Sequence, residues 1–189
     1  MKKIKIEDTI YEVDTDFRVA IECDRIARDK TINDTERSLA ILYILFKNIE
    51  NPEHYEKMMN WAINYLTFGK ERTTSKEPDM DLTKDKGLIA SSFKYDYNYN
   101  PYNMDYLSWE EFYTDLENLT SNVELGNCCA LNRARYWRNY DISKVEDPKE
   151  KADIMKIKQY YALDKEEPEI ILTEEQQKSV DEFYKALGY

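Results

Sequence analysis

The residues from Leu39 to Phe46 carry no polar side-chain group except the hydroxyl of Tyr43. A helix that is apolar on every side must be covered by protein all round. The run is far shorter than the roughly 20 residues that cross a bilayer, so we do not interpret it as a membrane span. The sequence therefore predicts a buried central helix of a soluble domain, with the other helices packed around it.

The composition favours helices over sheets. Four glycines and five prolines are too few for the many tight turns of a sandwich or barrel. The formal net charge of −11 argues against binding to the phosphate backbone of nucleic acid or to an anionic membrane surface. We therefore expect an acidic, all-α protein that binds neither nucleic acid nor membranes.

Capping patterns predict about seven or eight helices. Residues 1–13 alternate briefly between apolar and polar side chains, which indicates a short extended N-terminal arm or hairpin. The expected helix starts are, in chain order, Asp14 or Thr15, Asn33 or Asp34, Asn51 with Pro52, Ser108 with Glu111, Ser121 with Glu124, Asp147 with Glu150, and Thr173 with Gln176. One more helix, without a predicted cap, is expected over residues 84–96.

We expect three parts in the chain. The extended arm covers residues 1–13, and the helical domain covers 14–163. Residues 164–189 form a charged connection and a C-terminal helix with one narrow apolar stripe, made of Val180, Phe183, Tyr184 and Leu187. That stripe can dock on its own domain, bind a partner, or pack against another copy and build a homo-oligomer.

The residues contain no recognisable catalytic or metal-binding constellation. Cys23, Cys128 and Cys129 are an odd number without Cys-x-x-Cys spacing, and adjacent cysteines on a helix point about 100° apart, so we interpret all three as buried, reduced thiols. His54 is the only histidine, and we expect it to be solvated or hydrogen-bonded rather than a catalytic base. We predict no cofactor, no metal and no enzymatic activity.

Two segments leave open whether they serve packing or binding. Residues 95–106 alternate tyrosine with asparagine and aspartate before and after Pro101. Their rings can be pinned on the core or can offer Tyr97, Tyr99 and Tyr102 to a protein partner. A basic cluster of Arg133, Arg135 and Arg138 beside Tyr136 and Trp137 can bind nucleic acid, but pairing with the chain's own carboxylates fits the composition better.

A series of motifs in residues 10–163 resembles a protein family of tailed bacteriophages and prophages. This family is encoded in the tail gene cluster and is usually called the gene-product-fifteen family. The motifs are Tyr11-x-Val-x-x-Asp-Phe-Arg18, Trp61-Ala-Ile-x-Tyr-Leu-x-Phe-Gly69, Leu88-Ile-Ala-Ser-Ser-Phe93, Asp105-Tyr-Leu-Ser-Trp-x-x-Phe112, Arg135-Tyr136 and Lys156-x-Lys-x-Tyr-Tyr-Ala-Leu163. The chain departs from the family at Ser108-Trp109-Glu110, where a His-Trp-Trp run is common, and it matches a Tyr-Arg-Ser run near 133–138 only loosely.

The resemblance implies a small helical protein of tail assembly in the host cytoplasm. It implies most directly a chaperone that coats the tape-measure protein, or binds another tail protein, during tail morphogenesis. The alternative is a structural subunit of the virion, such as a completion or connector protein. No apolar run follows Met1-Lys2-Lys3, so we also expect no secretory signal.

Overall fold

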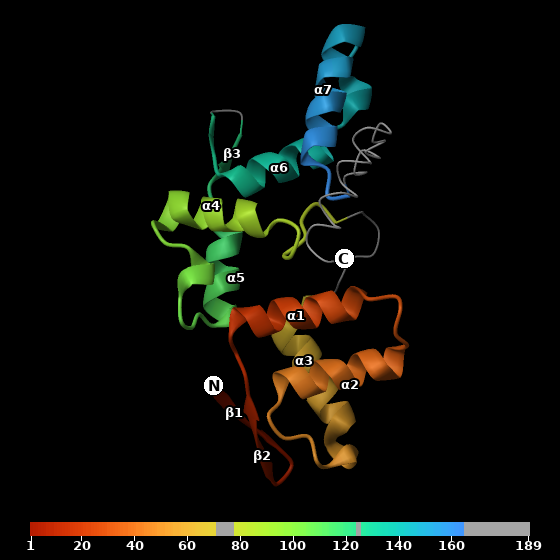
Figure 1. The fold of residues 1–189 in the computed structure, drawn as a ribbon, viewed down its shortest axis with the longest axis vertical. Coiled ribbons are helices and arrows are strands. Elements are labelled where there is room, and N and C mark those ends of the chain that lie inside the picture. Colours follow the sequence, from red (N-terminus) through yellow and green to blue (C-terminus); the bar gives the residue numbers. More distant parts are fainter. Residues whose placement is uncertain (71–77, 124–125, 165–189) are drawn as a thin grey trace, which may run out of the picture.

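The computed structural model describes residues 1–70, 78–123 and 126–164 (Figure 1). These residues form seven α-helices and two small antiparallel strand pairs, so the fold is mostly helical but not strictly all-α. In chain order the elements are β1 (Lys2–Ile6), β2 (Thr9–Val13), α1 (Phe17–Arg28), α2 (Asp34–Leu45), η1 (Pro52–His54), α3 (Tyr55–Thr67), α4 (Lys86–Tyr97), η2 (Pro101–Asn103), α5 (Trp109–Glu117), β3 (Ser121–Asn122), β4 (Asn127–Cys128), α6 (Ala130–Asn139), η3 (Ile142–Lys144) and α7 (Pro148–Tyr161).

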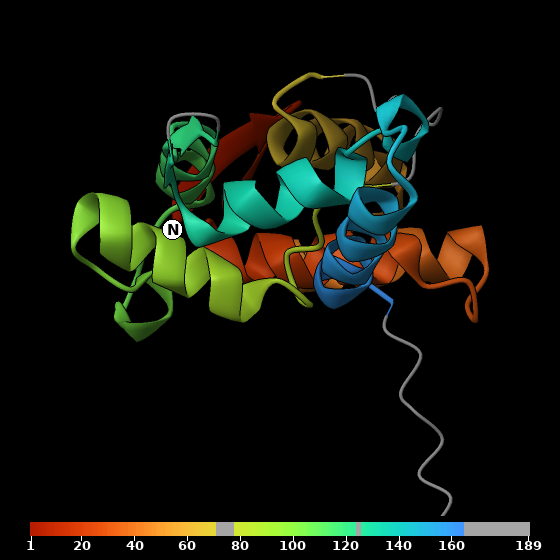
Figure 2. The same ribbon diagram turned by 90° about the horizontal axis from the view of Figure 1, so that it is seen from above.

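The helices form two groups that meet at α1 and α5. The β1–β2 hairpin, α1, α2 and α3 make one group, and α4, α6 and α7 make the other, with α5 between α4 and α1 (Figure 1). Seen from above, α4 and α6 run beside each other and α7 follows at the far end of α6 (Figure 2). Within the described ranges, no helix is long and apolar enough to cross a membrane.

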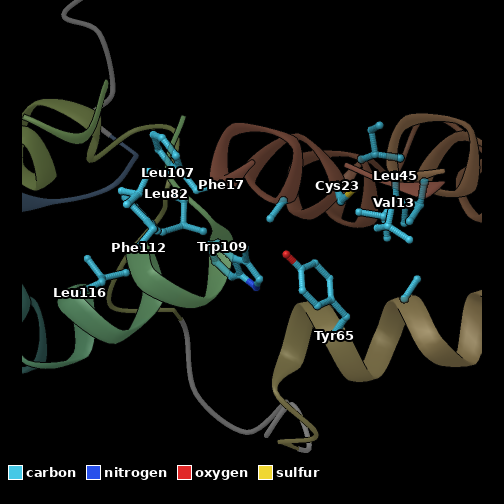
Figure 3. Close-up of a cluster of buried hydrophobic side chains, with 14 of the residues drawn as sticks. Val13, Phe17, Cys23, Leu45, Tyr65, Leu82, Leu107, Trp109, Phe112 and Leu116 are labelled. Carbon is cyan, nitrogen blue, oxygen red and sulfur yellow. The ribbon is translucent and has the colours of Figure 1, made fainter. Parts of the chain in front are cut away.

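A stack of aromatic rings forms the centre of the core and connects the two groups. The ring of Phe112 on α5 stacks on Phe17 of α1, with centroids 4.4 Å apart, and on Phe93 of α4, with centroids 5.3 Å apart. All three phenylalanines are fully buried. Figure 3 shows the buried side chains of α5 on one side of the cluster and those of the first group, among them Leu45 and Tyr65, on the other.

A short backbone bridge joins α1 and α5 at their N-termini. Asp16 and Ser108 pair as an isolated antiparallel bridge. The N–H of Phe17 donates to the carbonyl of Leu107 at 2.9 Å, and the N–H of Trp109 donates to the carbonyl of Thr15 at 2.8 Å. Asp16 and Ser108 are also the N-caps of the two helices, so both helices begin at the same joint.

The predicted central helix is α2, and the prediction that protein covers it all round is wrong. Leu42 and Leu45 are buried, but the side chain of Tyr43 is 67% exposed, and α2 lies at the outside of its group against α1 and α3 (Figure 1). The reason is the helical spacing: Ile41, Leu42 and Leu45 share one face, and that face alone is needed to cover α1 and α3. The aromatic stack, rather than α2, occupies the middle of the core.

Most predicted helix starts are confirmed. Asn33 with Glu36 and Ser108 with Glu111 form complete capping boxes. Asn51 caps η1, which leads directly into α3, and Asp147 caps α7 by accepting from the N–H of Lys149. The first helix is capped by Asp16 rather than by Asp14 or Thr15. The capping box of Thr173 with Gln176 lies outside the described residues.

The prediction that a helix begins after Ser121 is wrong. Ser121 lies in β3, which pairs with β4 in the register Ser121 to Cys128 and Asn122 to Asn127. Gly126 has φ of +71°, a conformation that glycine adopts readily and that reverses the chain between the two strands. The helix α6 therefore begins only at Ala130. Cys129 is its N-cap, and the Cys129 sulfur accepts a hydrogen bond from the N–H of Asn132.

The N-terminal arm is a hairpin whose side chains join the core. Tyr11 and Val13 are buried, and the hydroxyl of Tyr11 hydrogen-bonds to Nδ1 of His54 at 2.6 Å. The other ring nitrogen of His54, Nε2, donates to the carboxylate of Glu7 at 3.1 Å. The prediction of a hydrogen-bonded histidine is confirmed: His54 fixes the hairpin against the start of α3.

Candidate partner-binding surface

For residues 95–106 the sequence left open whether the tyrosines pack on the core or face a partner, and the structure shows Tyr97, Tyr99 and Tyr102 packed against their own core. The hydroxyls of Tyr97 and Tyr99 donate to the backbone carbonyl and the carboxylate of Asp115, at 2.8 and 2.6 Å. The ring of Tyr102 packs edge-on against Phe17, and burial raises the pKa of its hydroxyl to about 12. The alternative that these rings are pinned on the core is therefore confirmed, and they complete the core around α5.

The other predicted contact residues lie beyond the described part of the chain. These are the stripe residues Val180, Phe183, Tyr184 and Leu187. A partner-binding role for them, as for Tyr97, Tyr99 and Tyr102, stays a prediction.

Two arginines of the basic cluster on α6, Arg135 and Arg138, pair with the chain's own carboxylates, as expected, and Arg133 donates to the carbonyl of Cys128. Arg138 makes a two-point ion pair with Asp85, at 2.7 and 2.8 Å, and the side chains are only 10% and 4% exposed. Arg135 pairs with Asp79 at 3.2 Å. These pairs fix α6 against the segment that leads into α4.

Arg138 and Lys158 also hold α7 in place. Arg138 donates to the backbone carbonyl of Tyr161 at 2.5 Å, and Lys158 donates to the carbonyls of Arg138 and Tyr140 at 2.8 and 2.7 Å. The helix end at Tyr161 is thereby bound to α6 by charge-assisted hydrogen bonds, which are about twice as strong as neutral ones. The last turn of α7 is a fixed part of the surface.

A cleft of about 830 Å³ opens between α4, α6 and the end of α7. The buried ion pair of Arg138 and Asp85 forms part of its wall. Its lining also contains Lys84, Gly87, Leu88, Ala130, Arg133, Tyr160, Tyr161, Ala162, Leu163 and Asp164. The lining combines aromatic rings with three basic side chains, and two of these, Lys84 and Arg138, pair with Asp164 and Asp85 of the same lining.

A second, more apolar hollow of about 490 Å³ adjoins the cleft on the outer side of α7. Trp137, Lys156, Ile157, Tyr160 and Tyr161 line it, and we call these five residues the α6–α7 surface. Tyr160 and Tyr161 line both cavities, so these two residues separate the cleft from the hollow at the end of α7. The side chain of Tyr160 is 68% exposed, so water meets a large aromatic ring here.

The charge of this region differs from that of the whole chain. Residues 127–164 contain eight lysines and arginines against six aspartates and glutamates, in a chain of net charge −11. Of the cations that line the cleft and the hollow, Lys84, Arg138 and Lys156 pair with Asp164, Asp85 and Asp153, so the apolar rings rather than charge distinguish this surface.

The sequence of α7 places Met155 and Tyr160 outside the face that runs through Ile154, Ile157 and Tyr161. In the structure Ile154 is buried, whereas Met155 and Tyr160 are both more than half exposed. The helix α7 therefore has more apolar surface than α6 and η3 cover.

The three cysteines are free thiols and are buried, as predicted. Cys128 and Cys129 do not share a helix, because Cys128 lies in β4 and Cys129 caps α6. In the part of the chain that the structure describes, no group of three or more His, Cys, Asp or Glu residues could hold a metal ion.

Slow thiol labelling is expected from this burial. Desolvation raises the pKa of Cys23 to about 12 and also raises the pKa of Cys128 above its ordinary value. Burial both disfavours the reactive thiolate and blocks access, so the native protein should react with a thiol reagent at least about tenfold more slowly than the protein in urea. Labelling of the native chain as fast as of the unfolded chain would contradict the buried positions.

Comparison with known proteins agrees with the motif series. Neither the curated proteins nor the solved structures contain a match to this chain. The model of one family, described as Bacteriophage Gp15 protein, matches residues 1–163, a range that contains all seven described helices and the α6–α7 surface. The chain belongs to the bacteriophage Gp15 protein family.

Proposed function

We propose that this protein is a phage tail assembly chaperone that binds the tape-measure protein in the host cytoplasm during tail morphogenesis. Membership of the bacteriophage family supports a role in phage assembly. The observation that carries the proposal further is the α6–α7 surface, an exposed aromatic hollow in a slightly basic part of an acidic protein. We propose a binding protein and not an enzyme.

A tape-measure protein is a long helical protein whose apolar stretches aggregate unless they are covered before the tail tube forms. A chaperone for it needs an apolar surface of its own that accepts one face of a helix. Trp137, Ile157 and Tyr160 form such a surface, and Lys156 at its edge can meet acidic residues of the bound helix. The negative charge of the rest of the chain keeps the complex soluble.

Co-expression tests the proposal. An aggregation-prone tape-measure fragment should become soluble when the chain is co-expressed with it, and the two should co-purify. Replacing Ile157 and Tyr160 by serine should lower the co-purified amount by about tenfold or more, since truncation of central interface side chains typically costs 2 kcal/mol or more. A Tyr43→Ser variant is the control, because Tyr43 is equally exposed but lies on α2.

Two outcomes would contradict the proposal. Binding that is lost only in the Tyr43→Ser control would move the contact to α2, and a fragment that stays insoluble with the wild-type chain would argue against a chaperone. Purified phage particles distinguish the alternative function, a structural subunit of the virion. A chaperone should be absent from the particles, whereas a completion or connector protein should be present in fixed copy number.

A further inference from the structure

The chain continues for 25 residues after Asp164, which itself lines the cleft. Residues 165–189 contain three lysines against seven aspartates and glutamates, so this segment is acidic where residues 127–164 are slightly basic. Its apolar residues Val180, Phe183, Tyr184 and Leu187 follow helical spacing and form one stripe. The chain therefore carries its own acidic segment with an apolar stripe next to an apolar hollow, whose one charged lining residue, Lys156, also pairs with Asp153 at 3.2 Å.

We propose that residues 173–187 dock on the α6–α7 surface of their own chain. The stripe would cover the hollow at Trp137, Ile157 and Tyr160, with carboxylates of the segment beside Lys156. The stripe supplies the apolar face that this hollow lacks as a cover. Residues 162–172 connect it to the end of α7, which Arg138 holds by a hydrogen bond to the carbonyl of Tyr161.

The connection between Asp164 and the stripe is long enough to let the stripe reach the hollow, and short enough to keep the stripe close to it. Residues 165–172 can span at most about 26 to 29 Å when fully extended. The hollow reaches Tyr161, three residues before Asp164, so the stripe can fold back on it without moving the helices. A link of this length gives an effective local concentration of the order of mM, which a second copy reaches only in very concentrated solution.

The docking has a regulatory consequence that rests on the proposed function. If the α6–α7 surface binds the tape-measure protein, the C-terminal segment must leave it first, and the segment protects the exposed aromatic rings in the free chaperone. The partner then competes with residues 173–187 for the same hollow. Removing the stripe should therefore tighten partner binding while lowering the solubility of the free chain.

Carbodiimide cross-linking of the full-length chain tests the docking without any partner. This reagent joins a lysine amine to a carboxylate only when the two are in direct contact. We expect a link within one chain between Lys156 and an acidic residue of 173–187, found by mass spectrometry of the monomer band. A Phe183→Asp, Leu187→Asp variant should lose this link, because it replaces the apolar stripe by charge.

A control variant has the same change in net charge. Replacing Lys178 and Lys185 by asparagine also makes the chain more negative by two charges, but it leaves the stripe intact, so the link to Lys156 should remain. Links found only in a dimer band would overturn docking within one chain. Absence of the link in the wild-type chain, or its persistence in the stripe variant, would overturn the proposal altogether.

The outcomes keep the two proposals apart. A chain that shows the link but does not bind the tape-measure fragment retains the docking and refutes the chaperone function. A chain that binds the fragment through Tyr160 but shows no link retains the function and refutes the docking.

Discussion

Replacing Leu42 by aspartate is expected to leave the protein largely unfolded at room temperature. Leu42 is 2% exposed and faces the packed side of α2. A buried carboxylate without a partner costs several kcal/mol, against a total stability of about 5 to 15 kcal/mol for a typical domain. Urea unfolding followed by the helical circular dichroism signal measures the effect.

The neighbouring residue provides the control. Tyr43 is 67% exposed on the outer side of the same helix, so Tyr43→Asp should change the free energy of unfolding by no more than about 0.5 kcal/mol. Equal damage from both substitutions would show that α2 is covered all round, as its apolar sequence suggests. A cooperatively folded Leu42→Asp variant would instead remove α2 from the core.

Loss of the buried ion pair is expected to have the second largest effect. Arg138→Met leaves the carboxylate of Asp85 uncompensated at 4% exposure and also removes the hydrogen bonds to the carbonyls of Asp79 and Tyr161. Breaking a buried pair in this way typically lowers the free energy of unfolding by about 3 to 5 kcal/mol. Chemical denaturation of the variant and the wild type gives the difference directly.

Two variants show whether burial is the cause. Arg25→Met removes an exposed pair with Glu22 and should cost less than about 1 kcal/mol. Adding Asp85→Asn to Arg138→Met removes the uncompensated charge and should restore part of the loss. An Arg138→Met variant as stable as the Arg25→Met variant would mean that the pair is open to solvent.

Features set by neighbouring residues were predicted from the sequence. The capping boxes at Asn33 and Ser108 depend on side chains three residues apart, so the pattern of residues already contains the interaction. The same holds for Asn51 before Pro52, whose ring favours the first position of a helix. Helix number and most helix starts follow from such local preferences.

Features set by distant residues were not predicted. The pattern Ser121 to Glu124 also has capping-box spacing, but the chain pairs as a hairpin there, and no local preference decides between the two. The burial of Tyr99 depends on Asp115, and the position of Arg138 depends on Asp85, 53 residues earlier. The α6–α7 surface exists because of such contacts, so the sequence did not identify its residues as a site.

The backbone bridge between Thr15–Phe17 and Leu107–Trp109 also constrains the order in which the protein folds. During synthesis, α1, α2 and α3 leave the ribosome long before Leu107, so the N–H of Phe17 has no carbonyl to donate to at that time. Closing the bridge joins residues more than 90 positions apart, and such long-range closure is slow compared with helix formation. We therefore expect a nascent chain of about 70 residues to have helices but no fixed aromatic stack, which forms only when Phe112 has emerged.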